Sequence, residues 1–142
     1  MTKTSEKKPK KKPIKVGIIG TGGIARAYAR AYHNIPEAKI VGLCDIIPGK
    51  ADKYKETQDF PEAETFENHK EMLSKLDLDA VSVSTYNTTH SEVAVDALNA
   101  GLDVLCEKPM SVTLEESVNM AKAAKKNDKI LSIGFQPRYD HN

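Results

Sequence analysis

The sequence predicts an α/β fold in which helices cover both faces of a parallel, doubly wound sheet. Short apolar runs suited to buried strands alternate six times with segments of helical periodicity. The first apolar run, residues 14–19, leads into a glycine-rich turn that opens a helical pattern. With 142 residues, the chain has the size of a single domain that can bury a proper core.

The first half of the chain supplies three strand–helix pairs. Pro48 is expected in the first turn of the second helix, where a proline is tolerated. Asn68 is expected to cap the third helix with its side-chain oxygen. The predicted segments are strands over 14–19, 38–44 and 64–66, and helices over 24–33, about 49–57, and around 72–76.

The second half continues the alternation. Thr88 or Thr89 is expected to cap a helix whose apolar positions share one face, and Gly101 to end it. Thr113 and Glu116 have the spacing of a capping box, which opens the last helix. The predicted segments are strands over 80–84, 103–106 and 130–135, and helices around 93–98 and over 114–127.

The turn after the first strand reads Gly20-x-Gly22-x-x-Ala25, in the strand–turn–helix setting of a dinucleotide-binding fingerprint. Gly20 permits the tight turn, Gly22 lets the backbone approach a pyrophosphate, and Ala25 keeps the helix close to its strand. Free N–H groups at the helix start then face the phosphates. A purely structural turn is the alternative, but this setting favours a Rossmann fold with strand order 3-2-1-4-5-6.

An acidic residue is expected about 20 positions after the glycine turn, where it binds the ribose 2′-hydroxyl of NAD. Asp45 fits, directly after the second strand, although it could instead cap the following helix. Ile46 and Ile47 follow it, so a 2′-phosphate would meet a carboxylate and apolar side chains. NAD is therefore favoured as the cofactor, and Lys50 keeps NADP open.

Ligands of open α/β sheets lie beyond the carboxyl ends of the strands, at the point where the strand order reverses. Three segments meet there in this topology: the glycine turn, residues 85–90 and residues 107–109. Lys108 precedes Pro109, which restricts its backbone, and could relay the proton of a substrate hydroxyl; a surface ion pair is equally compatible with the spacing. Asn87 could bind the cofactor or hold the turn, and His90 could simply start the next helix. No metal site is indicated.

Charge is unevenly distributed along the chain. Residues 1–13 hold six lysines and one glutamate without apolar periodicity, which predicts a disordered tail. The remainder, residues 14–142, is mildly acidic, so nucleic acid is not an expected partner. No apolar segment follows the tail as in a secretory signal, and no run reaches membrane-spanning length.

Cys44 and Cys106 each end a predicted strand. In the expected strand order they lie three strand spacings apart, roughly 14 Å, which is too far for a disulfide. We therefore expect free thiols and a cytoplasmic protein.

Together these residues resemble the N-terminal domain of the glucose–fructose oxidoreductase/inositol dehydrogenase (Gfo/Idh/MocA) family, from about residue 14 to 140. Glu107-Lys108-Pro109 is the most specific element of the likeness. The other elements are Gly20-Thr21-Gly22-Gly23-Ile24-Ala25, Asp45, Asn87-x-x-His90, Ala97-Leu98-Asn99-Ala100-Gly101-x-Asp103-Val104, and Gly134-Phe135-Gln136-x-Arg138-Tyr139. Tyr86, where the family commonly has proline, and Pro137, where it has a basic residue, depart from the pattern.

The resemblance implies NAD(P)-dependent oxidation or reduction of a sugar or polyol hydroxyl, with Lys108 as the catalytic lysine and a Lys108–Pro109 bond that is cis in relatives. It implies that Glu107 and Asn87 line the nicotinamide ribose, and that Gln136 and Arg138 lie near the nicotinamide and the domain junction. It also implies a homo-oligomer and a second, substrate-binding domain that this chain lacks. The expected cofactor residues are Gly20, Thr21, Gly22, Gly23, Ile24, Asp45, Thr85, Tyr86, Asn87, His90, Glu107, Lys108 and Gln136.

A chain of this kind is expected to bind the cofactor without turning over substrate. The alternative is a stand-alone nucleotide-binding module that acts through a partner. The two readings differ in one observable: a cofactor domain should carry an apolar surface where a further domain docks, whereas an independent module should be polar there.

Overall fold

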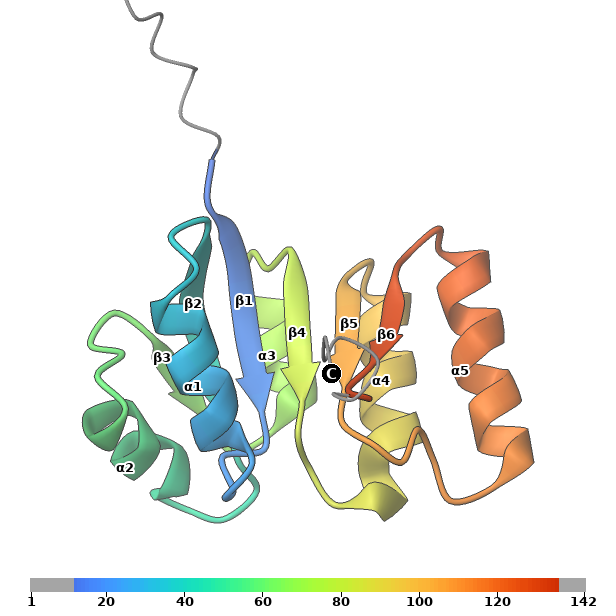
Figure 1. Cartoon of the computed structure of the whole chain (residues 1–142), viewed down its shortest axis with the longest axis horizontal. Helices are drawn as coiled ribbons and strands as arrows, with labels where there is room; N and C mark the ends of the chain where they lie inside the picture. The colour runs from blue at the N-terminus through green and yellow to red at the C-terminus, as the bar shows by residue number, and fades with distance from the viewer. Residues whose placement is uncertain (1–11, 136–142) are drawn as a thin grey trace, which may run out of the picture.

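The computed structural model describes residues 12–135, which form six parallel strands in a single sheet of order β3-β2-β1-β4-β5-β6 (Figure 1). This confirms the predicted doubly wound Rossmann fold. The strands are β1 (Ile14–Ile19), β2 (Ala38–Cys44), β3 (Glu64–Phe66), β4 (Ala80–Val83), β5 (Asp103–Cys106) and β6 (Leu131–Ile133). The helices are α1 (Ala25–His33), α2 (Lys50–Thr57), α3 (His69–Lys75), α4 (His90–Asn99) and α5 (Leu114–Lys126), with a 3-10 turn, η1 (Asn87–Thr89), before α4.

Both faces of the central strands are buried, which explains why β1 is apolar almost throughout. Val16 and Ile18 pack with the α1 and α2 side, and Ile19 packs with the core formed under α3, α4 and α5. In Figure 1, α1 and α2 lie in front of the sheet and the other helices lie behind it. The strands therefore run between two cores and end together at one edge.

The front layer covers only half of the sheet (Figure 1). Within residues 12–135, this face stays partly open over β5 and β6, with Leu105, Ser132 and Ile133 half-buried. These side chains and Ala27 and Ala31 of α1 line a hollow of about 360 Å³, which we call the open face.

Two helix starts differ from the sequence prediction. Pro48 does not lie in the first turn of α2, because Gly49 adopts a left-handed conformation (φ +72°) and the helix begins at Lys50. Thr89 is the residue before α4 but makes no capping bond with its side chain. Its hydroxyl lies 2.9 Å from both the Tyr86 carbonyl oxygen and the Thr85 hydroxyl, since the η1 turn directs it backwards. By contrast, Asn68 caps α3 and the Thr113–Glu116 capping box is present, as predicted.

Cys44 and Cys106 end β2 and β5, two strands that β1 and β4 separate, and both are buried free thiols. Burial raises the pKa of each thiol to about 12, with the neighbouring carboxylates of Asp45 and Glu107 acting in the same direction. Within residues 12–135, the longest helix is too short and too polar to span a bilayer.

Candidate functional site

The glycine turn is fixed by a close approach between the ends of β1 and β4. Gly20 has φ +90°, and a Cβ atom there would lie 2.6 Å from the carbonyl carbon and oxygen of Ser84. The Ser84 hydroxyl donates to the Gly20 carbonyl at 2.7 Å. Gly22 and Gly23 differ, because a Cβ atom at either would meet only open space. The turn therefore needs glycine at position 20 for its own packing, and presents a bare backbone at 22 and 23.

Asp45 is joined to the glycine turn by a network of hydrogen bonds. Its Oδ2 accepts from the Thr21 amide at 2.9 Å and from the Thr21 hydroxyl at 2.8 Å, and lies 2.9 Å from the Lys50 ammonium. Its Oδ1 accepts from the Ile47 amide at 3.1 Å. Burial acts to raise the pKa of Asp45, but these hydrogen bonds outweigh it and hold the pKa below its usual range. The carboxylate is thus charged and aimed at the turn.

A cleft of about 520 Å³ opens between the glycine turn, the segment after β2, and the segment after β4. The expected cofactor residues Gly20, Gly22, Gly23, Ile24, Asp45, Thr85 and Tyr86 line it, together with Ile19, Cys44, Ile46, Ile47, Lys50, His69, Ser84, Thr89, Glu92 and Val93. Thr21 lies beneath the turn, buried against Asp45. The cleft joins the carboxyl ends of β1, β2 and β4, where the topology predicts a ligand.

The segment after β4 forms one wall of this cleft. Tyr86 is 76% exposed and borders the opening. Asn87 is exposed and begins the η1 turn. An exposed aromatic ring beside an apolar cleft can stack on a planar ring system.

The segment after β5 brings Glu107 and Lys108 to the same edge of the sheet. Glu107 is buried, and its carboxylate accepts from the Tyr28 hydroxyl at 2.7 Å and from the Lys108 amide at 3.1 Å. Lys108 is exposed and precedes a cis bond to Pro109, as the resemblance implied. Burial and the adjacent Glu107 carboxylate raise the pKa of Tyr28, which keeps it a hydrogen-bond donor. The Tyr28 hydroxyl and the Lys108 amide both bond to the Glu107 carboxylate. This buried acid therefore holds the backbone from which the Lys108 side chain extends.

His90 is buried at the start of α4. The residue is 1% exposed and is not among the residues that line the cleft. Nδ1 lies 2.8 Å from the Pro109 carbonyl oxygen and Nε2 lies 3.2 Å from the Thr85 carbonyl oxygen. His90 therefore links the segment after β4 to the segment after β5.

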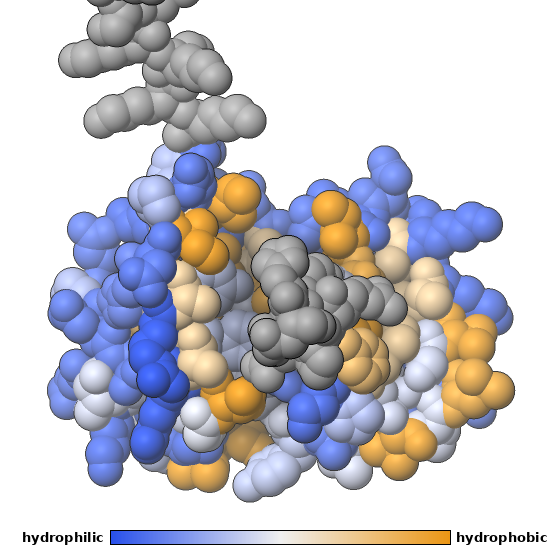
Figure 2. Space-filling model, viewed as in Figure 1, coloured by the Kyte–Doolittle hydropathy of each residue, from blue (hydrophilic) through white to orange (hydrophobic). Residues whose placement is uncertain are grey.

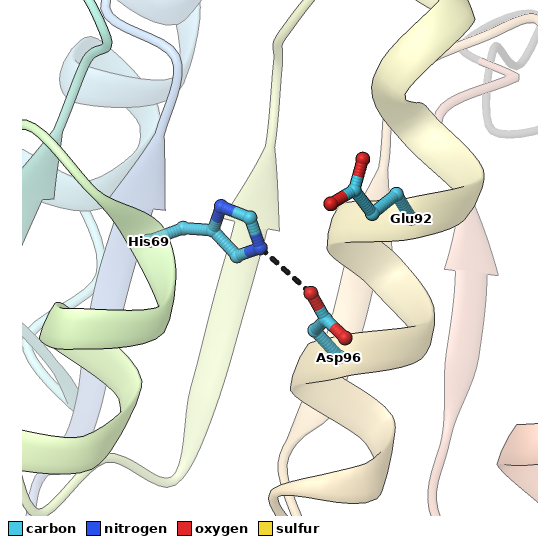
Figure 3. Close-up of side chains that lie close together, drawn as sticks. All are labelled: His69, Glu92 and Asp96. Atoms are coloured by element: carbon cyan, nitrogen blue, oxygen red, sulfur yellow. Dashed lines mark hydrogen bonds and ion pairs between the residues drawn. The ribbon is translucent and has the colours of Figure 1, made fainter.

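One further group of polar side chains, between α3 and α4, has ligand atoms within 4.8 Å of one another: His69, Glu92 and Asp96 (Figure 3). His69 Nε2 lies 2.8 Å from Asp96 Oδ2. The Lys70 ammonium lies 3.5 Å from a carboxylate oxygen of both Glu92 and Asp96. The chain supplies its own cation here, so we interpret the group as an ion-pair network that joins α3 to α4.

Sequence reasoning missed Tyr28, whose hydroxyl meets Glu107 across 79 positions of the chain. Tyr28 and Tyr32 are four residues apart on α1, and Tyr32 bonds to Ser82 in the same way. This four-residue spacing could have indicated that both tyrosines lie on one face of the helix and direct their hydroxyl groups at the sheet. Gln136 and Arg138, expected at the nicotinamide side, lie outside the described residues.

Known proteins share this arrangement. Residues 14–135 match the sequence profile of the oxidoreductase family with the NAD-binding Rossmann fold (Gfo/Idh/MocA). The chain is 35% identical over 133 residues to inositol 2-dehydrogenase of Salmonella typhimurium, covering 89% of this chain and 38% of that protein. It is 39% identical over 125 residues to glucose-6-phosphate 3-dehydrogenase of Bacillus subtilis, covering 88% and 34%.

Solved structures agree with the sequence comparison. Scyllo-inositol dehydrogenase of Lactobacillus casei, with bound NAD(H) and scyllo-inositol, superposes with a TM-score of 0.83 at 28% identity. The match covers 92% of this chain and 38% of that one. The chain thus spans little more than a third of the length of these relatives, and it belongs to the Gfo/Idh/MocA oxidoreductase family, as a chain with that family's NAD-binding Rossmann fold.

Proposed function

We propose that this chain is the NAD(H)-binding domain of a dehydrogenase that acts on a secondary hydroxyl of a sugar or polyol. One observation carries the proposal: the glycine turn, Asp45 and the Thr85–Tyr86 wall surround a single cleft at the strand ends. The inositol and sugar-phosphate dehydrogenases among its relatives support the substrate class.

Different residues of the cleft would bind different parts of the dinucleotide. The bare backbone at Gly22 and Gly23 admits the pyrophosphate, and Asp45 accepts from a ribose hydroxyl. Ile46, Ile47 and Tyr86 surround the adenine with apolar and aromatic surface. The cofactor supplies hydride transfer at its nicotinamide ring.

Lys108 is the residue that we propose to touch the substrate. Its exposed side chain extends from the end of β5, beside the buried Glu107 carboxylate. During oxidation, the Lys108 side chain in its neutral amine form would accept a hydrogen bond from the substrate hydroxyl and then take its proton, becoming an ammonium. We propose that Asn87 and Glu107 lie beside the nicotinamide ribose, as the family resemblance implies. We propose the reducing cytoplasm as its location, in keeping with the two free thiols.

The stand-alone module is the second candidate, and the open face weighs against it. Leu105 and Ile133 leave apolar surface over β5 and β6, beside Ala27 and Ala31 of α1. In Figure 2, apolar side chains gather over α1, at the border of this region. A polar face was the expectation for an independent module, so this surface favours a domain that packs against a further layer of structure.

Calorimetric titration with NADH tests the proposal. We expect saturable binding by the chain, and an affinity reduced about tenfold or more in Asp45→Ala, because a charge-assisted hydrogen bond to the ribose is lost. Glu56→Ala is the matched control, since Glu56 is an exposed acid on α2 outside the cleft. A folded chain that binds no NADH would contradict the proposal and favour a different ligand for the glycine turn.

A further inference from the structure

The open face and the cofactor cleft meet at Ile24, which lines both. In the proposed binding mode, the adenosine half of the dinucleotide lies at Asp45, on the β2 side of the glycine turn. A dinucleotide crosses the sheet where the strand order reverses, so its other half lies on the β4 and β5 side. Glu107 follows β5 on that side and lines the open face. Its carboxylate therefore lies at the nicotinamide end of the proposed site.

Two donors from different parts of the chain hold the Glu107 carboxylate. Tyr28 of α1 donates its hydroxyl to Oε1 at 2.7 Å, and the Lys108 amide donates to Oε2 at 3.1 Å. Within residues 12–135, no other group donates to this buried side chain. Each donor thus holds one oxygen, and only the Tyr28 hydroxyl can be removed by changing a side chain.

The bond between Tyr28 and Glu107 lies in a closely fitted space. A Cβ atom at Gly134, directly after β6, would lie 3.3 Å from both Glu107 Oε1 and the Tyr28 hydroxyl oxygen. The backbone at the end of β6 therefore packs over the pair without a side chain between them. Burial and the adjacent carboxylate raise the pKa of Tyr28, so its hydroxyl keeps the proton that it donates.

Tyr28 lies on the helix that begins at the glycine turn, since α1 starts at Ala25. The helix that faces the pyrophosphate in the proposed site thus also carries the hydroxyl that holds Glu107. We propose that Tyr28 is a positioning residue for the nicotinamide end of the site: its hydroxyl fixes the Glu107 carboxylate and, through it, the backbone that carries Lys108. Tyr28 acts through Glu107 and touches no substrate. This inference rests on the proposed function, since it needs a dinucleotide in the cleft.

The test compares NADH and ADP binding by the full chain and its Tyr28→Phe variant, by calorimetry. ADP carries the adenosine and both phosphates but lacks the nicotinamide riboside. We expect NADH affinity to fall about fivefold, as the loss of one hydrogen bond predicts, and ADP affinity to change less than about twofold. A loss of stability alone would not separate the two ligands. Tyr32→Phe is the matched control, because it removes a hydroxyl of the same helix that bonds to Ser82 and lines neither hollow.

Two further measurements show whether Tyr28 acts through Glu107. In a Glu107→Ala background, Tyr28→Phe should cause no additional loss of NADH affinity, because no carboxylate remains for the hydroxyl to hold. In nitrogen-15 NMR spectra, Tyr28→Phe should shift the resonance of the Lys108 amide, whereas Tyr32→Phe should not.

Several results would overturn the positioning role while leaving the proposed function standing. These are equal losses of NADH and ADP affinity, no loss of NADH affinity, a full fivefold loss in the Glu107→Ala background, and an unchanged Lys108 amide resonance. A folded wild-type chain that does not bind NADH would overturn both.

Discussion

Replacing Gly20 by alanine should destabilise the fold far more than the same change at Gly101. Both glycines have left-handed backbones, with φ +90° and +84°. At Gly101 a Cβ atom meets nothing within 4 Å, but at Gly20 it lies 2.6 Å from backbone atoms of Ser84. Comparing the two variants separates the cost of pushing the two strand ends apart from the cost of a left-handed backbone at a residue other than glycine.

The expected loss of unfolding free energy follows from the hydrogen bonds between the ends of β1 and β4. Left-handed alanine costs about 1 kcal/mol, and this is the whole effect expected of Gly101→Ala. At position 20 the strand ends must also separate. That strains two hydrogen bonds: Ser84 N–H to Ile19 O, and Ser84 Oγ–H to Gly20 O. At about 1 kcal/mol each, and with the backbone cost added, the Gly20→Ala total is roughly 3 kcal/mol.

Urea unfolding followed by circular dichroism measures both free energies of unfolding. Gly22→Ala completes the set, since a methyl group there meets open space and should leave stability within about 0.5 kcal/mol of wild type. NADH affinity should fall sharply in Gly22→Ala, because the methyl group stands where the pyrophosphate approaches. Equal destabilisation by Gly20→Ala and Gly101→Ala would refute the reasoning from strand contact.

Three further outcomes are expected. Tyr28→Phe should lower the free energy of unfolding by about 1 kcal/mol in a urea titration, because the buried Glu107 carboxylate loses a donor. With thiol pKa values raised to about 12, Cys44 and Cys106 should resist iodoacetamide at pH 8 until urea unfolds the chain, as mass spectrometry would show; rapid labelling of the folded chain would contradict their burial. The pKa of Asp45 is lowered in the fold, so its stabilisation is present above the unfolded value of about 4 and is lost as pH falls through the folded value. Urea midpoints between about pH 5 and pH 2 should therefore drop more steeply for wild type than for Asp45→Asn, and parallel curves would contradict this.

The sequence predicted the central strands well because β1, β2 and β4 are short apolar runs that are mostly buried. β1, β2, β3 and β5 begin and end at the predicted residues. Thr89 precedes α4 as predicted, but the expected capping bond is absent because its hydroxyl bonds back to Thr85 and Tyr86, which local capping rules do not contain. The start of α2 was wrong because Pro48 indicated a helix that the left-handed Gly49 delays.

The candidate site also contains residues that the sequence could predict and residues that it could not. Gly20 and Asp45 could be predicted because their motif describes the path of the backbone itself. Tyr28 could not, because its contact with Glu107 exists only after α1 packs on the sheet. The two carbonyl neighbours of His90 could not be predicted either, since sequence spacing does not show which way a ring at a helix start turns.

The His90 link has a consequence for how this domain can diverge. Its two ring nitrogens face main-chain carbonyl oxygens, and every amino acid offers a carbonyl. Side chains at positions 85–87 can therefore change over generations while the two segments keep their path. Because the backbone keeps its path while these side chains change, new ligand preferences can arise without a new fold.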